Sequence, residues 1–243
     1  MEKSRLETTL DGIRISRTLD VATGAGNYAS FLRTNIKGCG AITAIDVDRT
    51  MLTRAKEHLD KIADVSPACM NSAMMAFKPE AFDMVCISNS LHHMSKLEDT
   101  LAEMLRVLRP GGYFLVSEMF RDGQTDAQMT HVLMHEWWAE IDTALGVSHN
   151  GTFRKDEILD ICAIPSLGLE NMISQDYAFL DKDPLDPEAV EYIDGAIDMY
   201  VKKASGLDNF ENLKIRGDEL RERLHSTGFH GATTLVILGS KSA

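Results

Sequence analysis

The feature that most constrains the fold is an apolar run that ends in a glycine turn, Leu19-Asp20-Val21-Ala22-Thr23-Gly24-Ala25-Gly26-Asn27. Such a run is typical of a buried β-strand that ends beneath a ligand, because a side chain at either glycine would hinder close approach of the backbone. A second apolar run, 41–45, leads to Asp46. A carboxylate at the end of that strand can accept hydrogen bonds from both hydroxyls of a ribose. Together the two motifs predict a site for a nucleoside cofactor.

One class of protein that uses such motifs is the nicotinamide-dependent oxidoreductases. The turn departs from their G-x-G-x-x-G fingerprint at the third glycine, where position 29 is Ala. Alanine is tolerated there, so an NAD(P)-dependent oxidoreductase is an alternative. That class also needs a catalytic Tyr-x-x-x-Lys or an equivalent, and neither Tyr28 nor Tyr113 has such a partner.

Two further segments complete a recognisable order of motifs. An apolar run, 82–88, leads into Leu91-His92-His93, and a helix-like run ends in Leu108-Arg109-Pro110-Gly111-Gly112 before another apolar run. With the glycine turn and Asp46, these segments resemble the class I S-adenosylmethionine-dependent methyltransferases, in their small-molecule (UbiE or methyltransferase type 11-like) branch. The resemblance covers residues 15 to 120. It implies S-adenosylmethionine as cofactor and methyl transfer to a small-molecule acceptor.

Strand and helix patterns alternate along the first half of the chain, which predicts an α/β fold with a doubly wound parallel sheet. The resemblance extends this to a mostly parallel, seven-stranded, Rossmann-like sheet. Predicted strands cover 18–22, 41–46, 67–70, 82–88, 113–119, 171–179 and 233–238. Predicted helices cover 28–34, 50–59, 97–108, 126–145, 155–164 and 217–227, and another follows Asp186.

The second half carries more helix than such a sheet requires. We expect a cofactor-binding core at 1–120, a helical cap segment at 121–165, and the final strands at 166–243 with a helical insertion at about 182–228. The insertion and the cap segment together are the candidate substrate cap.

The resemblance assigns the cofactor site residue by residue. Asp20, Gly24 and Gly26 would frame the methionine end of the cofactor, and Asp46 would bind its ribose. Asn71 and Ser72, after the third strand, would meet the adenine, and the backbone of Ser88 would line the methionine moiety. The nearby Asp48 is better explained as the N-cap of the following helix.

Five of the eight histidines lie between positions 92 and 149. His93 lies at the sheet edge where ligands bind, so it is a candidate base for the acceptor. His131 and His135 share a helix face and would chelate a metal with His149 or Glu136 as third ligand, but Glu136 projects elsewhere on the helix and no Cys or Asp completes the set. We therefore expect no metal, and we place His131, His135 and Trp138 in the substrate pocket.

Composition disfavours several partners. The formal charge is −12 with no basic patch, which disfavours nucleic acid, and no apolar stretch approaches eighteen residues, so we expect no membrane partner. The four scattered cysteines and the polar start of the chain predict a cytoplasmic protein, and the helical insertions would suit a homodimer. A non-catalytic S-adenosylmethionine-binding regulatory protein is a further alternative, because methyl transfer need leave no catalytic signature.

Overall fold

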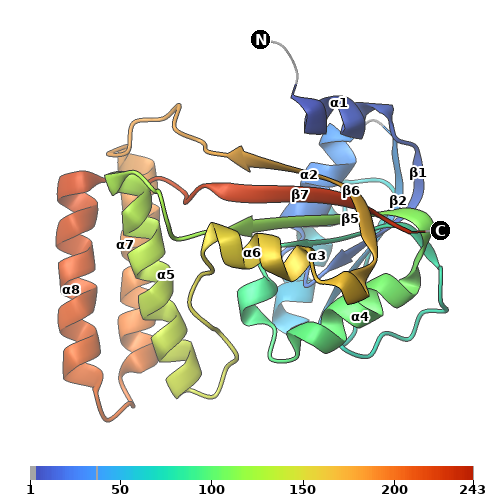
Figure 1. Cartoon of the computed structure of the whole chain (residues 1–243). Coiled ribbons are helices and arrows are strands. Elements are labelled where there is room, and N and C mark those ends of the chain that lie inside the picture. The colour runs from blue at the N-terminus through green and yellow to red at the C-terminus, as the bar shows by residue number, and fades with distance from the viewer. Residues whose placement is uncertain (1–3, 37, 243) are drawn as a thin grey trace.

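The computed structural model describes residues 4–36 and 38–242, and its centre is a seven-stranded sheet (Figure 1). The strand order is β3-β2-β1-β4-β5-β7-β6. The strands are β1 (Ile15–Val21), β2 (Cys39–Asp46), β3 (Val65–Cys69), β4 (Phe82–Ser88), β5 (Leu108–Met119), β6 (Leu169–Tyr177) and β7 (Thr234–Lys241).

The first five strands run parallel to one another, and β7 runs antiparallel to both of its neighbours, β5 and β6. The mostly parallel sheet predicted from the sequence is thus confirmed. The order of strands reverses between β1 and β4, and crevices at such a point, beyond the carboxyl ends of the strands, are where open α/β sheets bind ligands.

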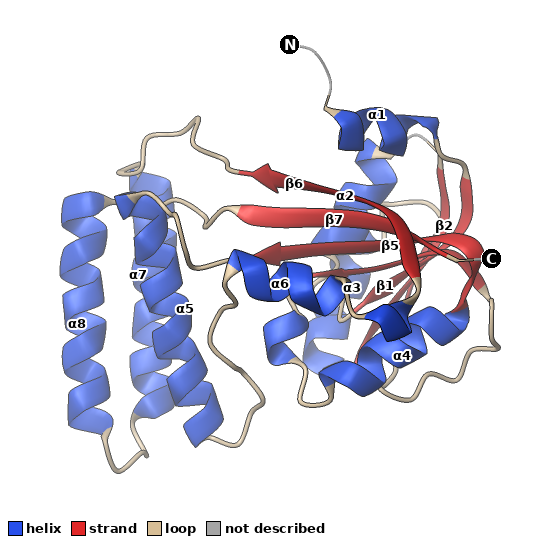
Figure 2. Cartoon of the chain, in the orientation of Figure 1, coloured by secondary structure: helices blue, strands red, loops and turns tan. Residues whose placement is uncertain are grey.

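Helices cover both faces of the sheet (Figure 2). Apolar residues of α1 (Arg5–Gly12), α2 (Asn27–Asn35) and α3 (Arg49–Leu59) pack into one core, whereas those of α4 (Leu97–Val107) and α6 (Lys155–Cys162) pack into the other. Two 3₁₀ turns, η1 (Leu91–His93) and η2 (Pro165–Leu167), complete this part. The central strands are buried on both faces, which explains their nearly continuous apolar sequences.

A separate three-helix bundle lies beyond the ends of β5 and β6 (Figure 1). It consists of α5 (Asp126–Ala144), α7 (Pro187–Ala204) and α8 (Phe210–Thr227). Its core surrounds Trp137, which is fully buried and donates from Nε1 to the carbonyl oxygen of Leu213 at 3.0 Å. The helices α7 and α8 lie between β6 and β7, inside the segment at 182–228.

Most elements differ from the prediction only at their ends, such as β5, which begins at Leu108 rather than at 113, whereas two helices differ more. The helix α8 starts at Phe210 rather than at Gly217, because this glycine packs within the helix instead of marking its start. A Cβ on Gly217 would lie 3.0 Å from Cζ2 of Trp137, so the missing side chain lets α8 approach α5 closely. The sequence prediction also omitted α1, although Ser4 and Glu7 form a capping box at its start.

Candidate functional site: a glycine turn, a cavity and a histidine cluster

The glycine turn connects β1 to α2 at the carboxyl edge of the sheet. Its backbone has positive φ at Ala22 (55°), Gly24 (54°) and Gly26 (84°). A Cβ on Gly26 would lie 2.7 Å from Cδ1 of Leu59, so glycine is needed there for packing as well as for conformation. At Gly24 a Cβ would meet only Cε of Met51, at 3.7 Å, which leaves the outer side of the turn open to a ligand.

Asp46 joins this turn to the end of β2. Its Oδ2 accepts a hydrogen bond from the backbone N–H of Gly24 at 2.8 Å, and its Oδ1 accepts one from the N–H of Asp48 at 2.9 Å. A carboxylate has about four acceptor positions, so the half-exposed Asp46 retains capacity for the hydroxyls of a ribose. Asp48 caps α3 by accepting from Thr50 and Met51, as predicted.

Asp20 is buried behind the turn, with 1% of its surface exposed. Its carboxylate accepts a hydrogen bond from Oγ1 of Thr23 at 2.6 Å and lies 3.5 Å from Sγ of Cys86. Burial raises the pKa of Asp20 to about 6, despite the opposing effect of these hydrogen bonds. The side chain therefore braces the turn from inside.

The other candidate cofactor residues lie at the same edge of the sheet. Asn71 is exposed just after β3, and its Oδ1 accepts from the N–H of Ala73 at 2.9 Å. The hydroxyl of Ser72 lies 3.2 Å from that of Thr100, and Ser88 is the last residue of β4. The fold thus places each of these residues on the side of the sheet where the glycine turn and Asp46 lie.

A cavity of about 650 Å³ adjoins this edge between the sheet and the helices α1 and α2. Its wall is mostly apolar, with side chains such as Leu10, Phe31 and Val236, whereas Ser88 and Ser117 provide hydroxyls. Cavities of this volume and composition are typical small-molecule sites. The side chains predicted to form the substrate pocket, His131, His135 and Trp138, are not among the residues that line it.

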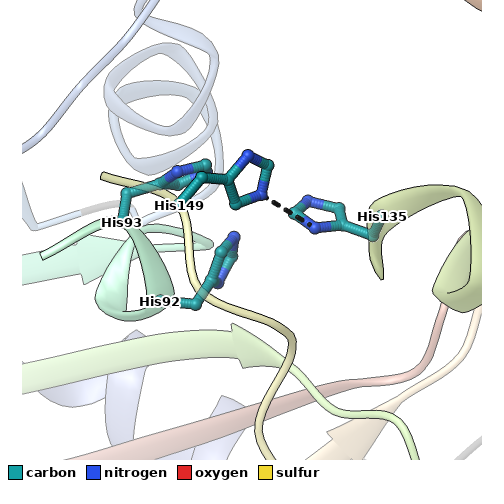
Figure 3. A group of neighbouring side chains, drawn as sticks. All are labelled: His92, His93, His135 and His149. Carbon is teal, nitrogen blue, oxygen red and sulfur yellow. Dashed lines mark hydrogen bonds between the residues drawn. The ribbon is translucent and has the colours of Figure 1, made fainter. Parts of the chain in front are cut away.

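Four histidines instead gather between η1, α5 and the loop after α5: His92, His93, His135 and His149 (Figure 3). His149, which the sequence analysis named as a possible third ligand beside His131 and His135, lies next to His135. His131 does not join this group, because its Nδ1 accepts from the N–H of Ala232 at 2.9 Å.

Two other side chains of α5 near His135, Glu136 and Trp138, have partners outside the histidine group. Glu136 accepts from the N–H and the hydroxyl of Thr152, and Trp138 stacks on Tyr200.

Three histidines in this region are held in their neutral form. Burial, together with a smaller effect of neighbouring histidines, lowers the pKa of His93 to about 3, of His131 to about 4 and of His135 to about 2. A neutral imidazole can accept a proton or bind a metal, but with so low a pKa it is a weak base. This weakens the prediction that His93 is the general base.

Two buried carboxylates that orient the histidines were missed by the sequence analysis. Glu118, fully buried on β5, accepts from the N–H groups of Ser90 and Leu91 and lies 2.6 Å from Nδ1 of His92. Asp142 of α5 lies 2.9 Å from Nδ1 of His149. The position of Glu118 within the apolar run of β5 was the available signal, because a buried charge needs partners.

Comparisons with known proteins identify the domain. Residues 19–116 match the family model described as a methyltransferase domain. The chain is also 32% identical over 119 residues to the ubiquinone/menaquinone biosynthesis C-methyltransferase UbiE of Nitrosospira multiformis, which covers 48% of this chain and 49% of that relative. The chain thus spans about half the length of the curated relatives that it matches.

Solved structures show the same fold. The YcgJ protein of Bacillus subtilis aligns with a TM-score of 0.60 and 17% identity, covering 98% of this chain and 97% of that one. Phosphoethanolamine N-methyltransferase 2 of Haemonchus contortus aligns with a TM-score of 0.57 and 16% identity, covering 98% and 52%.

Residues 19–116 are therefore a class I S-adenosylmethionine-dependent methyltransferase domain. This confirms the resemblance seen in the sequence and disfavours the nicotinamide alternative. Within residues 4–36 and 38–242, the structure contains no helix with the length and apolarity needed to cross a membrane.

Proposed function

We propose that this protein transfers a methyl group from S-adenosylmethionine to an apolar, hydroxyl-bearing small molecule. The observation that carries the proposal is the continuity of the two sites. Ser88, the last residue of β4, lies in the cavity wall. The neighbouring strand in the sheet, β1, leads into the glycine turn, where Oδ2 of Asp46 accepts a hydrogen bond from the N–H of Gly24 at 2.8 Å.

In this proposal the cofactor lies over the glycine turn. Asp46 binds the ribose, Asn71 and Ser72 meet the adenine, and the backbone at Ser88 lines the methionine moiety. Gly24 and Gly26 allow the methionine end to approach the backbone, while the buried charge of Asp20 favours its ammonium group. S-adenosylmethionine, when bound, supplies a methyl group made electrophilic by its positively charged sulfur.

The acceptor occupies the 650 Å³ cavity. The apolar wall favours a largely hydrocarbon or aromatic molecule, and the hydroxyls of Ser88 and Ser117 would orient one polar group of it. The UbiE relatives, named for C-methylation in quinone biosynthesis, support an aromatic quinone precursor as the acceptor class.

The protein's contribution to catalysis is to align the acceptor with the methyl group and to exclude water. Alignment of two bound reactants supplies up to roughly 7–11 kcal/mol of barrier lowering. Tyr28, in the cavity wall, stays protonated because burial raises its pKa well above the usual range, so it can donate a hydrogen bond but cannot act as a base.

The test is turnover of radiolabelled S-adenosylmethionine with a panel of hydroxylated aromatic compounds. We expect labelled product and S-adenosylhomocysteine in equal amounts. In Val236→Trp, which fills the cavity, KM for the acceptor should rise while cofactor affinity stays unchanged. The same substitution at the exposed Ile215 of α8 should change neither. Cofactor binding without turnover on any compound would favour the non-catalytic regulatory protein.

Three finer expectations belong to the same proposal. The bundle and the loop that carries His149 form a cap over the cofactor-binding core, with the boundaries predicted from the sequence. The protein works in the cytoplasm, without nucleic acid or membrane partners. A homodimer through the exposed faces of α7 and α8 is the expected assembly, and light scattering of the purified protein measures it directly.

A further inference from the structure

The four-histidine cluster has no role in the proposed methyl transfer. Its members come from three segments: His92 and His93 from η1, His135 from α5, and His149 from the loop after α5 (Figure 3). One nitrogen from each ring lies within 4.8 Å of the others. Such convergence of imidazoles from distant parts of the chain requires an explanation.

Two of the rings have a tautomer fixed by a carboxylate. Glu118 and Asp142 are acceptors when ionised, so Nδ1 of His92 and Nδ1 of His149 must carry the hydrogens in these pairs. In a neutral ring, the form that binds a metal, Nε2 then carries the lone pair, and Nε2 of His149 faces His135. Carboxylates that orient histidines through the distal nitrogen are typical of the second shell of metal sites.

Nε2 of His92 is buried and has no hydrogen-bond partner among the residues that the structure describes. Burial of an acceptor without a partner destabilises the folded state. A metal ion at the centre of the cluster would satisfy this atom, together with Nε2 of His149.

The spacing of the nitrogens suits a first-row transition metal. Nε2 of His149 lies 3.2 Å from Nδ1 of His135. In a tetrahedral zinc site with metal–nitrogen distances of roughly 2.0–2.1 Å, neighbouring ligand atoms lie about 3.3–3.4 Å apart. The widest of the separations reaches 4.8 Å, so the four rings must move closer together to bind one ion. The rings of His93 and His135 are only partly buried, which leaves them accessible to an ion.

The surrounding structure holds these ligands in place. The N–H of Asn150 and its side-chain amide both donate to the carbonyl oxygen of His92, at 2.8 and 3.1 Å, which fixes the His149 loop to η1. Asp142 also accepts from Lys203 at 2.5 Å and Tyr200 at 3.1 Å, so α7 anchors the second carboxylate. These contacts fix the loop backbone and the carboxylate behind the rings, which lowers the cost of assembling a metal site.

We propose that His92, His93, His135 and His149 bind one divalent transition-metal ion of the zinc class, oriented by Glu118 and Asp142. Imidazole donors favour zinc, copper, iron or nickel over magnesium or calcium. The site lies beside the cofactor turn, since Oγ of Ser90 donates to the carbonyl oxygen of Ala22 at 3.3 Å. The inference does not depend on methyl transfer, because the metal can be measured in the absence of any substrate.

The test is calorimetric titration of the metal-free full chain with Zn²⁺, together with the visible spectrum of bound Co²⁺. We expect one equivalent of Zn²⁺ that displaces Co²⁺. His135→Gln removes a partly buried ligand. Zn²⁺ binding should weaken by more than the roughly 10- to 100-fold that is typical when a residue that only orients a ligand is lost. The matched control, His225→Gln, changes an exposed histidine of α8 and should bind as the unmodified protein does.

Circular dichroism of each metal-free variant checks its fold, and X-ray absorption of the zinc-loaded unmodified protein needs no variant. A first shell with three or four imidazoles supports the proposal. Binding of less than one equivalent, fewer than three imidazoles, or equal affinity in folded His135→Gln would overturn it.

Discussion

The glycine turn and the four-histidine cluster lie near the same edge of the sheet, but the chain builds them in different ways. The turn is local: Ala22, Gly24 and Gly26 shape its backbone, and one distant residue, Asp46, supports it with a hydrogen bond. The cluster is assembled from side chains of three segments, and two buried carboxylates orient it.

This difference has consequences for stability and for function. The turn belongs to the sheet and its flanking helices, whereas the histidine cluster depends on the docking of α5 and its following loop against η1. Damage to the bundle should therefore remove metal binding and leave cofactor binding, while changes at the turn should do the reverse. The four predictions below test this separation, from the largest expected effect to the smallest.

Trp137→Ala tests the bundle. The fully buried side chain fills the core of α5, α7 and α8, so its loss should lower the free energy of unfolding by about 3–5 kcal/mol, as measured by chemical denaturation. Zn²⁺ affinity should fall with it, and S-adenosylhomocysteine affinity should stay within twofold. The control Tyr192→Ala, at a side chain that is 78% exposed, should cost less than about 0.5 kcal/mol. Loss of cofactor binding in Trp137→Ala would show that the two regions are coupled.

Asp46→Ala tests the turn. The change removes the acceptor of Gly24 and the proposed acceptor of the ribose hydroxyls, each a hydrogen bond to a charged group worth about 1.5–3 kcal/mol. We expect S-adenosylhomocysteine affinity to fall on the order of 100-fold in equilibrium dialysis. Zn²⁺ affinity should be unchanged. An effect below about threefold, less than 0.7 kcal/mol, would remove Asp46 from the cofactor site.

The pH dependence of cofactor binding tests Asp20. Its folded pKa of about 6 lies above the usual 3.8, mainly because of burial, so the carboxyl group is half ionised at pH 6 and almost fully ionised above about pH 7. Binding of the positively charged ammonium group should thus be constant above about pH 7, about twofold weaker at pH 6 and about tenfold weaker at pH 5. Calorimetric titration from pH 5 to pH 8 measures the profile. Asp20→Asn should bind weakly with a flat profile, and a flat profile for the unmodified protein would exclude this role.

Asp48→Ala gives the smallest effect. Loss of the N-cap bonds to Thr50 and Met51 should destabilise the protein by about 1 kcal/mol in thermal or chemical unfolding. Cofactor affinity should change less than threefold, although Asp48 lies two residues from Asp46. A larger loss of affinity would mean that this carboxylate also faces the ligand.

Much of the fold could be predicted because the sequence signals that define its strands, helix starts and turns lie within short segments. Apolar runs mark the central strands, Asp48 and Asp186 mark helix starts, and the Gly24-Ala25-Gly26 turn marks the cofactor edge. The start of α8 could not be predicted, because glycine commonly marks a helix boundary, whereas Gly217 fits against Trp137 inside the assembled bundle.

The candidate site divides in the same way. The positions of Asp46 and Ser88 follow from the order of strands. The pairing of His135 with His92 and His93 rather than with His131 depends on how α5 docks, and His131 is turned to the backbone of Ala232 instead. Spacing along one helix shows which residues share a face, but it does not show which other segments pack against that face.

The most direct measurement of the central claim is calorimetric titration of the unmodified protein with S-adenosylhomocysteine, NAD and NADP in parallel. The account predicts binding of one equivalent of S-adenosylhomocysteine and no heat of binding from either nicotinamide cofactor. Binding of NAD or NADP, with none of S-adenosylhomocysteine, would contradict the assignment of the glycine turn and Asp46 to a methyltransferase cofactor site.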